Sequence, residues 1–150
     1  MWQRIQTLWL LLAGVAMTLL LFFPMGMGSA SDGGYEFLTI GARKIGGGIT
    51  DPTWGLFFVD LLSVLLSFVT IFLYKKRVLQ IRLSVVNALV IVGMLIYYAM
   101  LTYNFLSVHN LSYGFKFWFA MPIISIVFLY LAIRNIGADE AKVRALDRLR

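Results

Sequence analysis

The chain has no cysteine and only one histidine among its 150 residues. The missing cysteines exclude disulfides, iron–sulfur clusters and thiolate zinc sites, and one histidine cannot supply both axial ligands of a bis-histidine haem. Charge is also scarce, at 13% of the residues against about 25% in an ordinary globular chain. Hydrophobic residues make up 61% and the mean hydropathy is +0.86. These proportions predict an integral membrane protein, with no cofactor expected.

Four apolar segments are each long enough to cross a membrane. They cover about residues 5–25, 54–74, 83–105 and 117–133, and roughly 20 apolar residues span the hydrocarbon core as a helix. Backbone polar groups in lipid must be satisfied within the segment, so each span is predicted to be helical. The predicted fold is an all-α integral membrane protein with a single domain over residues 1–150. It is a bundle of four transmembrane helices with a short outer-loop hairpin and a C-terminal cytoplasmic amphipathic helix.

Lysine and arginine are concentrated at one end of the predicted bundle. Ten of the thirteen basic residues precede the first span, separate the second span from the third, or follow the fourth: Arg4, Lys75, Lys76, Arg77, Arg82, Arg134, Lys142, Arg144, Arg148 and Arg150. Only Arg43, Lys44 and Lys116 lie in the other two connecting segments. Because cytoplasmic loops carry the excess of basic residues, both termini are predicted to be cytoplasmic, and the segments 29–53 and 106–116 to face outward.

Six of these basic residues are predicted to contact lipid or a partner protein: Lys75, Lys76, Arg77, Arg82, Arg144 and Arg148. The first four follow the second span, next to the anionic headgroups of the inner leaflet, where each basic residue contributes about 1 kcal/mol. The predicted partners are the lipid bilayer and a larger membrane protein complex. The positive-inside bias accounts for the net charge of +6, so no nucleic-acid partner is expected.

The first outer segment contains a stretch with strand character. Residues 35–40 read Tyr-Glu-Phe-Leu-Thr-Ile and are rich in strand formers. Gly41 and the glycines at 46–48 then punctuate the chain. This pattern predicts a hairpin over the outer mouth of the bundle, with strands near 35–40 and 43–46.

The C-terminal tail, residues 138–150, has helical periodicity. Val143, Leu146 and Leu149 fall on one face, and Gly137 is expected to separate this amphipathic helix from the fourth span. One interpretation is a helix that rests on the inner leaflet, which is common behaviour for such segments. The other interpretation is a docking helix for a partner protein.

Polar residues at helical spacing follow one face of the second span and one face of the third. The candidate intramembrane polar site consists of Asp60, Ser63, Ser67, Asn87, Tyr97 and Tyr98. Asp60 is the only acidic residue within a span. Counting equal distances from the cytoplasmic connection places it level with Tyr97 and Tyr98, and places Asn87 level with Thr70. We therefore expect Asp60 to face the bundle interior and to hydrogen-bond a tyrosine hydroxyl.

Asp60 has two interpretations. An intramembrane carboxylate is a functional-site hypothesis by default, which indicates proton or solute handling. Serine, threonine and asparagine also hold membrane helices together, at about 0.6 kcal/mol per contact, so that the whole polar row would serve packing alone. The packing interpretation is favoured because the spans contain one acid and no base.

Several strings in the chain resemble one known family. They are Met1-Trp2-Gln3-Arg4-Ile5-Gln6-Thr7 before an apolar helix that closes in Phe22-Phe23-Pro24, Leu79-Gln80-Ile81-Arg82-Leu83, Tyr130-Leu131-Ala132-Ile133-Arg134, and the ending from Asp139 to Arg150. Together they resemble the small four-helix bacterial membrane proteins known as domain of unknown function 4293, over essentially the whole chain. The resemblance implies four spans in the inner membrane of a Gram-negative bacterium, and it implies no activity. Trp54-Gly55-Leu56 is also similar to a motif of claudin-like proteins, but the missing cysteines argue against that family.

The sequence offers no catalytic constellation, because no base stands near a nucleophile and no cluster of metal ligands occurs. We therefore predict no catalytic, cofactor-binding or metal-binding residues. The predicted function is that of a non-enzymatic, multi-pass inner-membrane protein that serves as an accessory or scaffold subunit of a larger membrane assembly. The alternative is a small proton- or solute-handling membrane protein centred on Asp60.

Overall fold

Four α-helices make up most of the chain. The computed structural model describes residues 2–30 and 33–147, and its helices are α1 (Trp2–Leu20), α2 (Trp54–Phe72), α3 (Arg77–His109) and α4 (Ala120–Asp147). Three helical segments are long and apolar enough to cross a membrane, namely Trp54–Phe72, Arg77–His109 and Phe117–Val143. Residues Ile5–Leu20 of α1 form a shorter apolar helix. By this measure of length and composition, the chain is a membrane protein.

A five-stranded antiparallel sheet adjoins the helices, so the prediction of an all-α four-helix bundle is wrong. The strands are β1 (Gly26–Ala30), β2 (Gly33–Leu38), β3 (Gly41–Lys44), β4 (Ile49–Pro52) and β5 (Ser112–Phe115), and their order is β4-β3-β2-β1-β5. The expected hairpin corresponds to β2 and β3. The other three strands were not expected, and β5 joins them from the second outer segment, far away in the sequence.

β1 forms through long-range pairing and not through local strand propensity. It contains glycine, which is depleted in strands. Gly26 pairs with Phe37 of β2 on one side and with Phe115 of β5 on the other. The Tyr113 side chain lies so close to Gly26 that a Cβ at this position would collide with the tyrosine hydroxyl. The glycine is therefore needed for packing, which local sequence patterns do not reveal.

Two helices are longer than the predicted spans. α3 extends beyond 83–105 at both ends, and Asn110 ends it in the left-handed conformation at φ 50° and ψ 46°. Its last turns pack against the sheet, where the Phe105 and Phe37 rings meet edge-on at 5.4 Å. α4 continues through Gly137 to Asp147, so the tail is not a separate amphipathic helix. One glycine in a helix costs only about 1 kcal/mol, and no proline follows it in the sequence.

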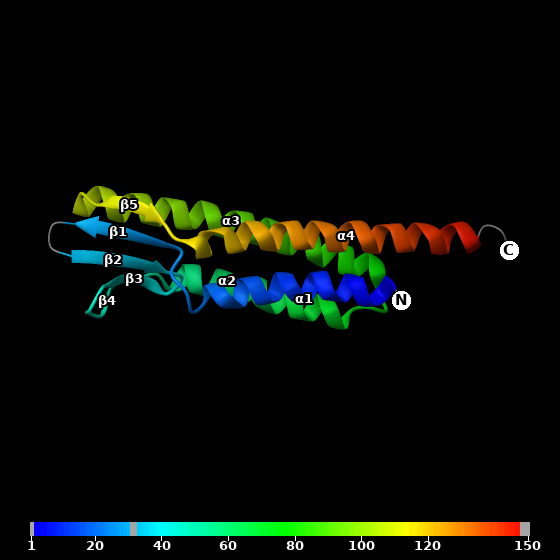
Figure 1. Cartoon of the computed structure of the whole chain (residues 1–150). Coiled ribbons are helices and arrows are strands. Elements are labelled where there is room, and N and C mark those ends of the chain that lie inside the picture. Colours follow the sequence, from blue (N-terminus) through cyan, green and yellow to red (C-terminus); the bar gives the residue numbers. More distant parts are fainter. Residues whose placement is uncertain (1, 31–32, 148–150) are drawn as a thin grey trace.

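The helices lie side by side in an elongated arrangement with the sheet at one end (Figure 1). The start of α1, the α2–α3 connection and the end of α4 lie at the opposite end, and α4 extends beyond the start of α1 (Figure 1). The buried core between the helices includes Leu10, Ala13 and Met17 of α1, Ile91 and Met94 of α3, and Leu129 and Ala132 of α4. We call the sheet end the outer end and the opposite end the inner end.

A group of three charged side chains ties the sheet together. Glu36 of β2 accepts a 2.7 Å hydrogen bond from Nη2 of Arg43 on β3 and another, also 2.7 Å, from Nζ of Lys116. Lys116 directly follows β5, so the group links the first outer segment to the second. The hydrogen bonds from Lys116 and Arg43 hold the pKa of the Glu36 carboxyl below its ordinary value of 4.5.

Glu36→Gln is expected to weaken the sheet at neutral pH. Because the folded-state pKa is lowered, the charged contact stabilises the fold fully above pH 4.5 and loses its effect as the pH falls through the folded-state pKa. A solvent-exposed ion pair is worth up to about 1 kcal/mol, so amides of β2 and β3 should exchange up to about five-fold faster in the variant at pH 7. Asp51→Asn, an exposed acid on β4, is the control. Equal exchange in the wild type and Glu36→Gln would contradict the prediction.

Candidate functional site

The face of α2 that points into the bundle is largely polar. Its buried residues recur three or four positions apart and are Leu56, Asp60, Ser63, Val64, Ser67 and Thr70. The opposite face exposes large apolar side chains, among them Phe58, Leu62 and Leu65. In a membrane the apolar face contacts lipid and the polar face contacts other helices. The pattern of the sequence therefore turns Asp60 inward.

α3 supplies polar side chains to the inner half of this interface. Nδ2 of Asn87 donates a 2.8 Å hydrogen bond to Oγ of Ser67. Nearer the inner end, Nε2 of Gln80 donates to the carbonyl oxygen of Thr70 at 3.2 Å, and the Ser84 hydroxyl donates to the Gln80 carbonyl at 2.9 Å. The first two hydrogen bonds join α2 to α3 between Asp60 and the connection, and the bond of Ser84 lies within α3.

Asp60 is fully buried, with 0% of its surface exposed. Within the described part of the chain, neither of its carboxylate oxygens has a hydrogen-bond partner, and the same holds for Oγ of Ser63 and Oδ1 of Asn87. Asp60 and Ser63 lie one turn apart on the same face of α2. The buried polar residues of the described ranges include no lysine, arginine or histidine that could balance the carboxylate. Buried polar oxygens of this kind require a functional or structural explanation.

The tyrosines expected beside Asp60 lie elsewhere, and the predicted hydrogen bond between Asp60 and a tyrosine is wrong. The Tyr98 hydroxyl lies 2.9 Å from the hydroxyl of Tyr113 on β5, and the two form a hydrogen bond. The Tyr97 side chain is 39% exposed and its hydroxyl lies beside Gly55. Burial raises the pKa of the Tyr113 hydroxyl above its ordinary value of 10.0.

The register of α2 against α3 explains this difference. Asn87 contacts Ser67 and not the expected Thr70. Counting outward along both helices from this hydrogen bond places Asp60 level with Met94, about one turn from Tyr98. The predicted register is wrong by one turn because α3 begins at Arg77, directly after a short turn and well before the predicted span.

A cavity of about 300 Å³ lies between the sheet and the outer ends of α2 and α3. Most of its wall is apolar, with Phe37 of β2 and Phe105 of α3 among the lining residues. Leu56 and Tyr98 line its deeper part, and Leu56 lies one turn outward of Asp60 on α2. The sequence analysis did not predict this cavity, although the sheet residues that line it come mainly from β2 and β3, the strands of the expected hairpin.

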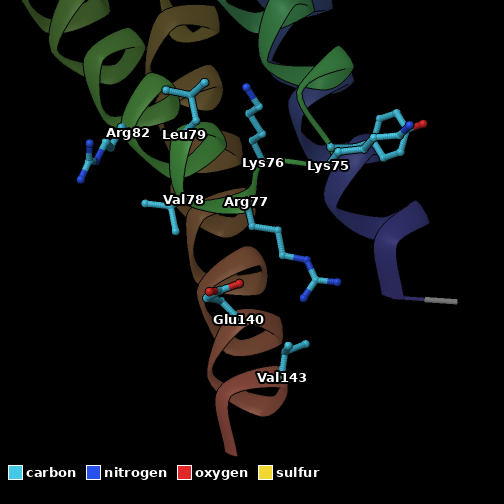
Figure 2. A pocket seen from close by; sticks show the side chains of 9 residues that line it. Lys75, Lys76, Arg77, Val78, Leu79, Arg82, Glu140 and Val143 are labelled. Atoms are coloured by element: carbon cyan, nitrogen blue, oxygen red, sulfur yellow. The ribbon is translucent and has the colours of Figure 1, made fainter. Parts of the chain in front are cut away.

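The predicted basic contacts come together in part. Lys75, Lys76, Arg77 and Arg82 line a second cavity, of about 700 Å³, at the inner end (Figure 2). Glu140 and Val143 of α4 form its other wall. The side chain of Arg144 and the whole of Arg148 lie outside the described part of the chain.

The chain matches the model of a known protein family. The family model described as "Domain of unknown function (DUF4293)" matches residues 2–149. A comparison with curated proteins found no match.

Proposed function

Because the chain belongs to the DUF4293 family, whose description assigns no activity, its function must be inferred from its own geometry, and we propose that it is a non-enzymatic membrane protein that handles protons or small cations through Asp60. One observation carries this proposal. The Asp60 carboxylate is fully buried in a helix long and apolar enough to cross a membrane, and no described residue pairs with it.

The unpaired polar atoms on this face of the helices favour a positively charged ligand. The unpaired atoms of Asp60, Ser63 and Asn87 are all oxygens, and oxygen is the ligand atom that hard cations prefer. A buried charge without compensation is costly, so the carboxylate gains stability by taking up a proton or a cation. The neutral oxygen of Ser63, one turn inward of Asp60, adds an acceptor without adding charge, and Asn87, which lies level with Ser67, adds another about two turns inward.

Features on both sides of Asp60 support movement of an ion toward it. Toward the outer end, the cavity under the sheet reaches Leu56, so that one side chain of α2 lies between the cavity and Asp60. Toward the inner end, Ser67, Thr70 and Gln80 continue the polar row.

The experiment that tests the proposal measures melting of the purified protein in detergent with Na⁺ or choline and at pH 5 or 8. Melting of the wild type should respond to Na⁺ or to pH, and melting of Asp60→Asn should respond to neither.

The proposed location is the inner membrane of a bacterium, with both termini in the cytoplasm. It is supported by the common inner end of α1, the α2–α3 connection and α4 (Figure 1), which is where ten of the thirteen basic residues lie in the sequence.

Single cysteines test this orientation, because the chain has no cysteine of its own. Gly48→Cys, in the turn before β4, is expected to react with a membrane-impermeant maleimide added outside the inner membrane. No heavy atom lies within 4 Å of a Cβ at this position, so the variant should fold. Ala141→Cys, on the exposed inner part of α4, should react only after permeabilisation. The reverse pattern of labelling would overturn the orientation.

A second candidate function is that of an accessory or scaffold subunit of a larger membrane assembly. It is supported by two elements that project beyond the helix bundle, namely the sheet at the outer end and the end of α4 at the inner end (Figure 1). β4 is an edge strand and is exposed along its whole length. Copurification in mild detergent, with and without residues 138–150, tests this function. Equal recovery of a partner from both forms would exclude docking through the tail.

A further inference from the structure

The cavity at the inner end has two walls of different origin. One wall comes from the α2–α3 connection and the first turns of α3, and it carries Lys75, Lys76, Arg77 and Arg82. The other wall is the part of α4 that continues past Gly137, with Glu140 and Val143. We call this cavity the basic pocket. It depends on α4 continuing as one helix, because a tail lying on the membrane surface would leave the second wall missing.

The basic pocket has a strong excess of positive charge. Glu140 is the one acidic residue among the described residues that line it, against four cationic side chains. In Figure 2 the Arg77 guanidinium is directed toward the α4 wall, while Arg82 lies on the other side of the α3 turn. The Lys75 ammonium lies 5.9 Å from the centre of the Tyr74 ring. Four cationic side chains around one cavity favour an anionic ligand.

The beginning of α3 adds to this preference. Its first turn contains no acidic residue, and the N-cap residue Lys76 makes no side-chain capping hydrogen bond. Capping positions usually hold serine, threonine, aspartate or asparagine, which would satisfy the free backbone N–H groups. α3 begins at Arg77, which lines the basic pocket, so the positive end of the helix dipole adds to the attraction of the four cations for an anion.

The position of the basic pocket identifies the kind of anion. Phe72 at the end of α2 is 78% exposed, and Val78, Leu79 and Val143 are exposed apolar residues at the pocket. An apolar rim beside basic residues, at the end of helices that cross a membrane, matches the boundary between acyl chains and headgroups. We propose that the basic pocket binds the phosphate of an anionic lipid headgroup, such as that of phosphatidylglycerol, with the glycerol and acyl chains against the apolar rim. This site is independent of the function proposed for Asp60.

The test is lipid retention by the full-length protein, measured by native mass spectrometry after exchange into detergent with added lipid. The wild type should retain phosphatidylglycerol in preference to phosphatidylcholine. Each basic residue contributes about 1 kcal/mol, which is about five-fold in affinity, so Arg77→Gln combined with Arg82→Gln should weaken retention of phosphatidylglycerol roughly 25-fold. Arg134→Gln is the matched control, since Arg134 is an exposed arginine of α4 that does not line the pocket. It should retain phosphatidylglycerol as the wild type does.

Several results would overturn the proposal. The double variant could bind phosphatidylglycerol as the wild type does, or Arg134→Gln could lose as much binding, which would indicate unspecific attraction of basic residues. Inorganic phosphate that displaces the lipid at equal concentration would indicate a site for soluble anions. Melting curves show whether each variant is folded. If the double variant is not folded, Lys76→Gln replaces it, and its affinity for phosphatidylglycerol should fall about five-fold. Asp60→Asn should bind the lipid normally, so failure of the Asp60 proposal and failure of this one can be told apart.

Discussion

Asp60→Leu is expected to make the protein more stable, by about 2–3 kcal/mol at neutral pH in the absence of Na⁺. The wild-type carboxylate is fully buried without a partner among the described residues, and an aspartate within a membrane-spanning helix costs about 2.5–3.5 kcal/mol on insertion scales. Leucine removes this cost and adds apolar contacts between Leu56 and Val64, and the expected gain requires the neighbouring side chains to adjust to its larger volume. Unfolding by denaturant in detergent, for the wild type and the variant side by side, measures the difference.

The sign of this effect separates two explanations of the polar row. If Asp60 only held helices together, its replacement by leucine would leave a partner unpaired and lower the stability. The expected partner is not there, because the Tyr98 hydroxyl already bonds Tyr113. Ser67→Ala is the matched control, since it removes the acceptor of the Asn87 side chain and should lower the stability by about 0.6 kcal/mol. A loss of stability in Asp60→Leu would show that the carboxyl group is a packing contact and would contradict the proposed role of Asp60.

Gly26→Val is expected to destabilise the outer sheet strongly. A Cβ at Gly26 would collide with the hydroxyl and the ring of Tyr113, and overpacking of this kind costs about 1–3 kcal/mol. Displacing the Tyr113 ring would also break its hydrogen bond to Tyr98, at about 1 kcal/mol. Unfolding by denaturant should therefore show a loss of roughly 2–4 kcal/mol.

A double-mutant cycle shows whether this loss comes from the tyrosine. Adding Tyr113→Ala removes the ring that a valine at position 26 would strike, so Gly26→Val should cost much less in this background. Gly48→Val is the control for replacing a glycine, because no heavy atom lies within 4 Å of a Cβ at Gly48. An equal cost of Gly26→Val in both backgrounds would show that the collision with Tyr113 does not determine it.

The helices were predictable because their signal is local. Long apolar stretches indicate helices in a membrane whatever they pack against. The structure has a helix within each predicted span, but only three described helical segments are long and apolar enough to cross a membrane, and α1 ends at Leu20, before the predicted end of the first span at residue 25. The predicted end of the fourth helix is wrong because Gly137 by itself does not break a helix, and α4 continues through it.

The sheet could not be predicted because its signal is not local. β1 consists of Gly-Met-Gly-Ser-Ala, which has little strand propensity of its own. It becomes a strand because β2 pairs on one side and β5 on the other, and Ser112 of β5 follows its partner Ser29 by 83 residues. The hairpin of β2 and β3 was predictable because β2 contains the strand formers Tyr35 and Phe37 and glycines punctuate the chain directly after it.

The sequence predicts that the polar side chains of the candidate site face the bundle interior, but it does not predict which residues they contact. The helical spacing of Asp60, Ser63 and Ser67 is enough to place them on one face, and the structure buries that face. Which residues of α3 lie opposite depends on where α3 begins, and an error of one turn is enough to place Asp60 beside Tyr98 and not beside Met94. The lack of a partner for the carboxylate, which carries the proposed function, could be seen only once the register was known.

Uptake of a proton or a small cation by Asp60 can be observed by infrared difference spectroscopy of the full-length protein in lipid nanodiscs. Spectra are recorded while the pH is changed and while Na⁺ replaces choline, for the wild type and for Asp60→Asn. We expect a carboxyl signal of the wild type that responds to pH or to Na⁺ and is missing from Asp60→Asn. Difference spectra of the wild type and Asp60→Asn that are the same under all of these conditions would contradict the proposed function.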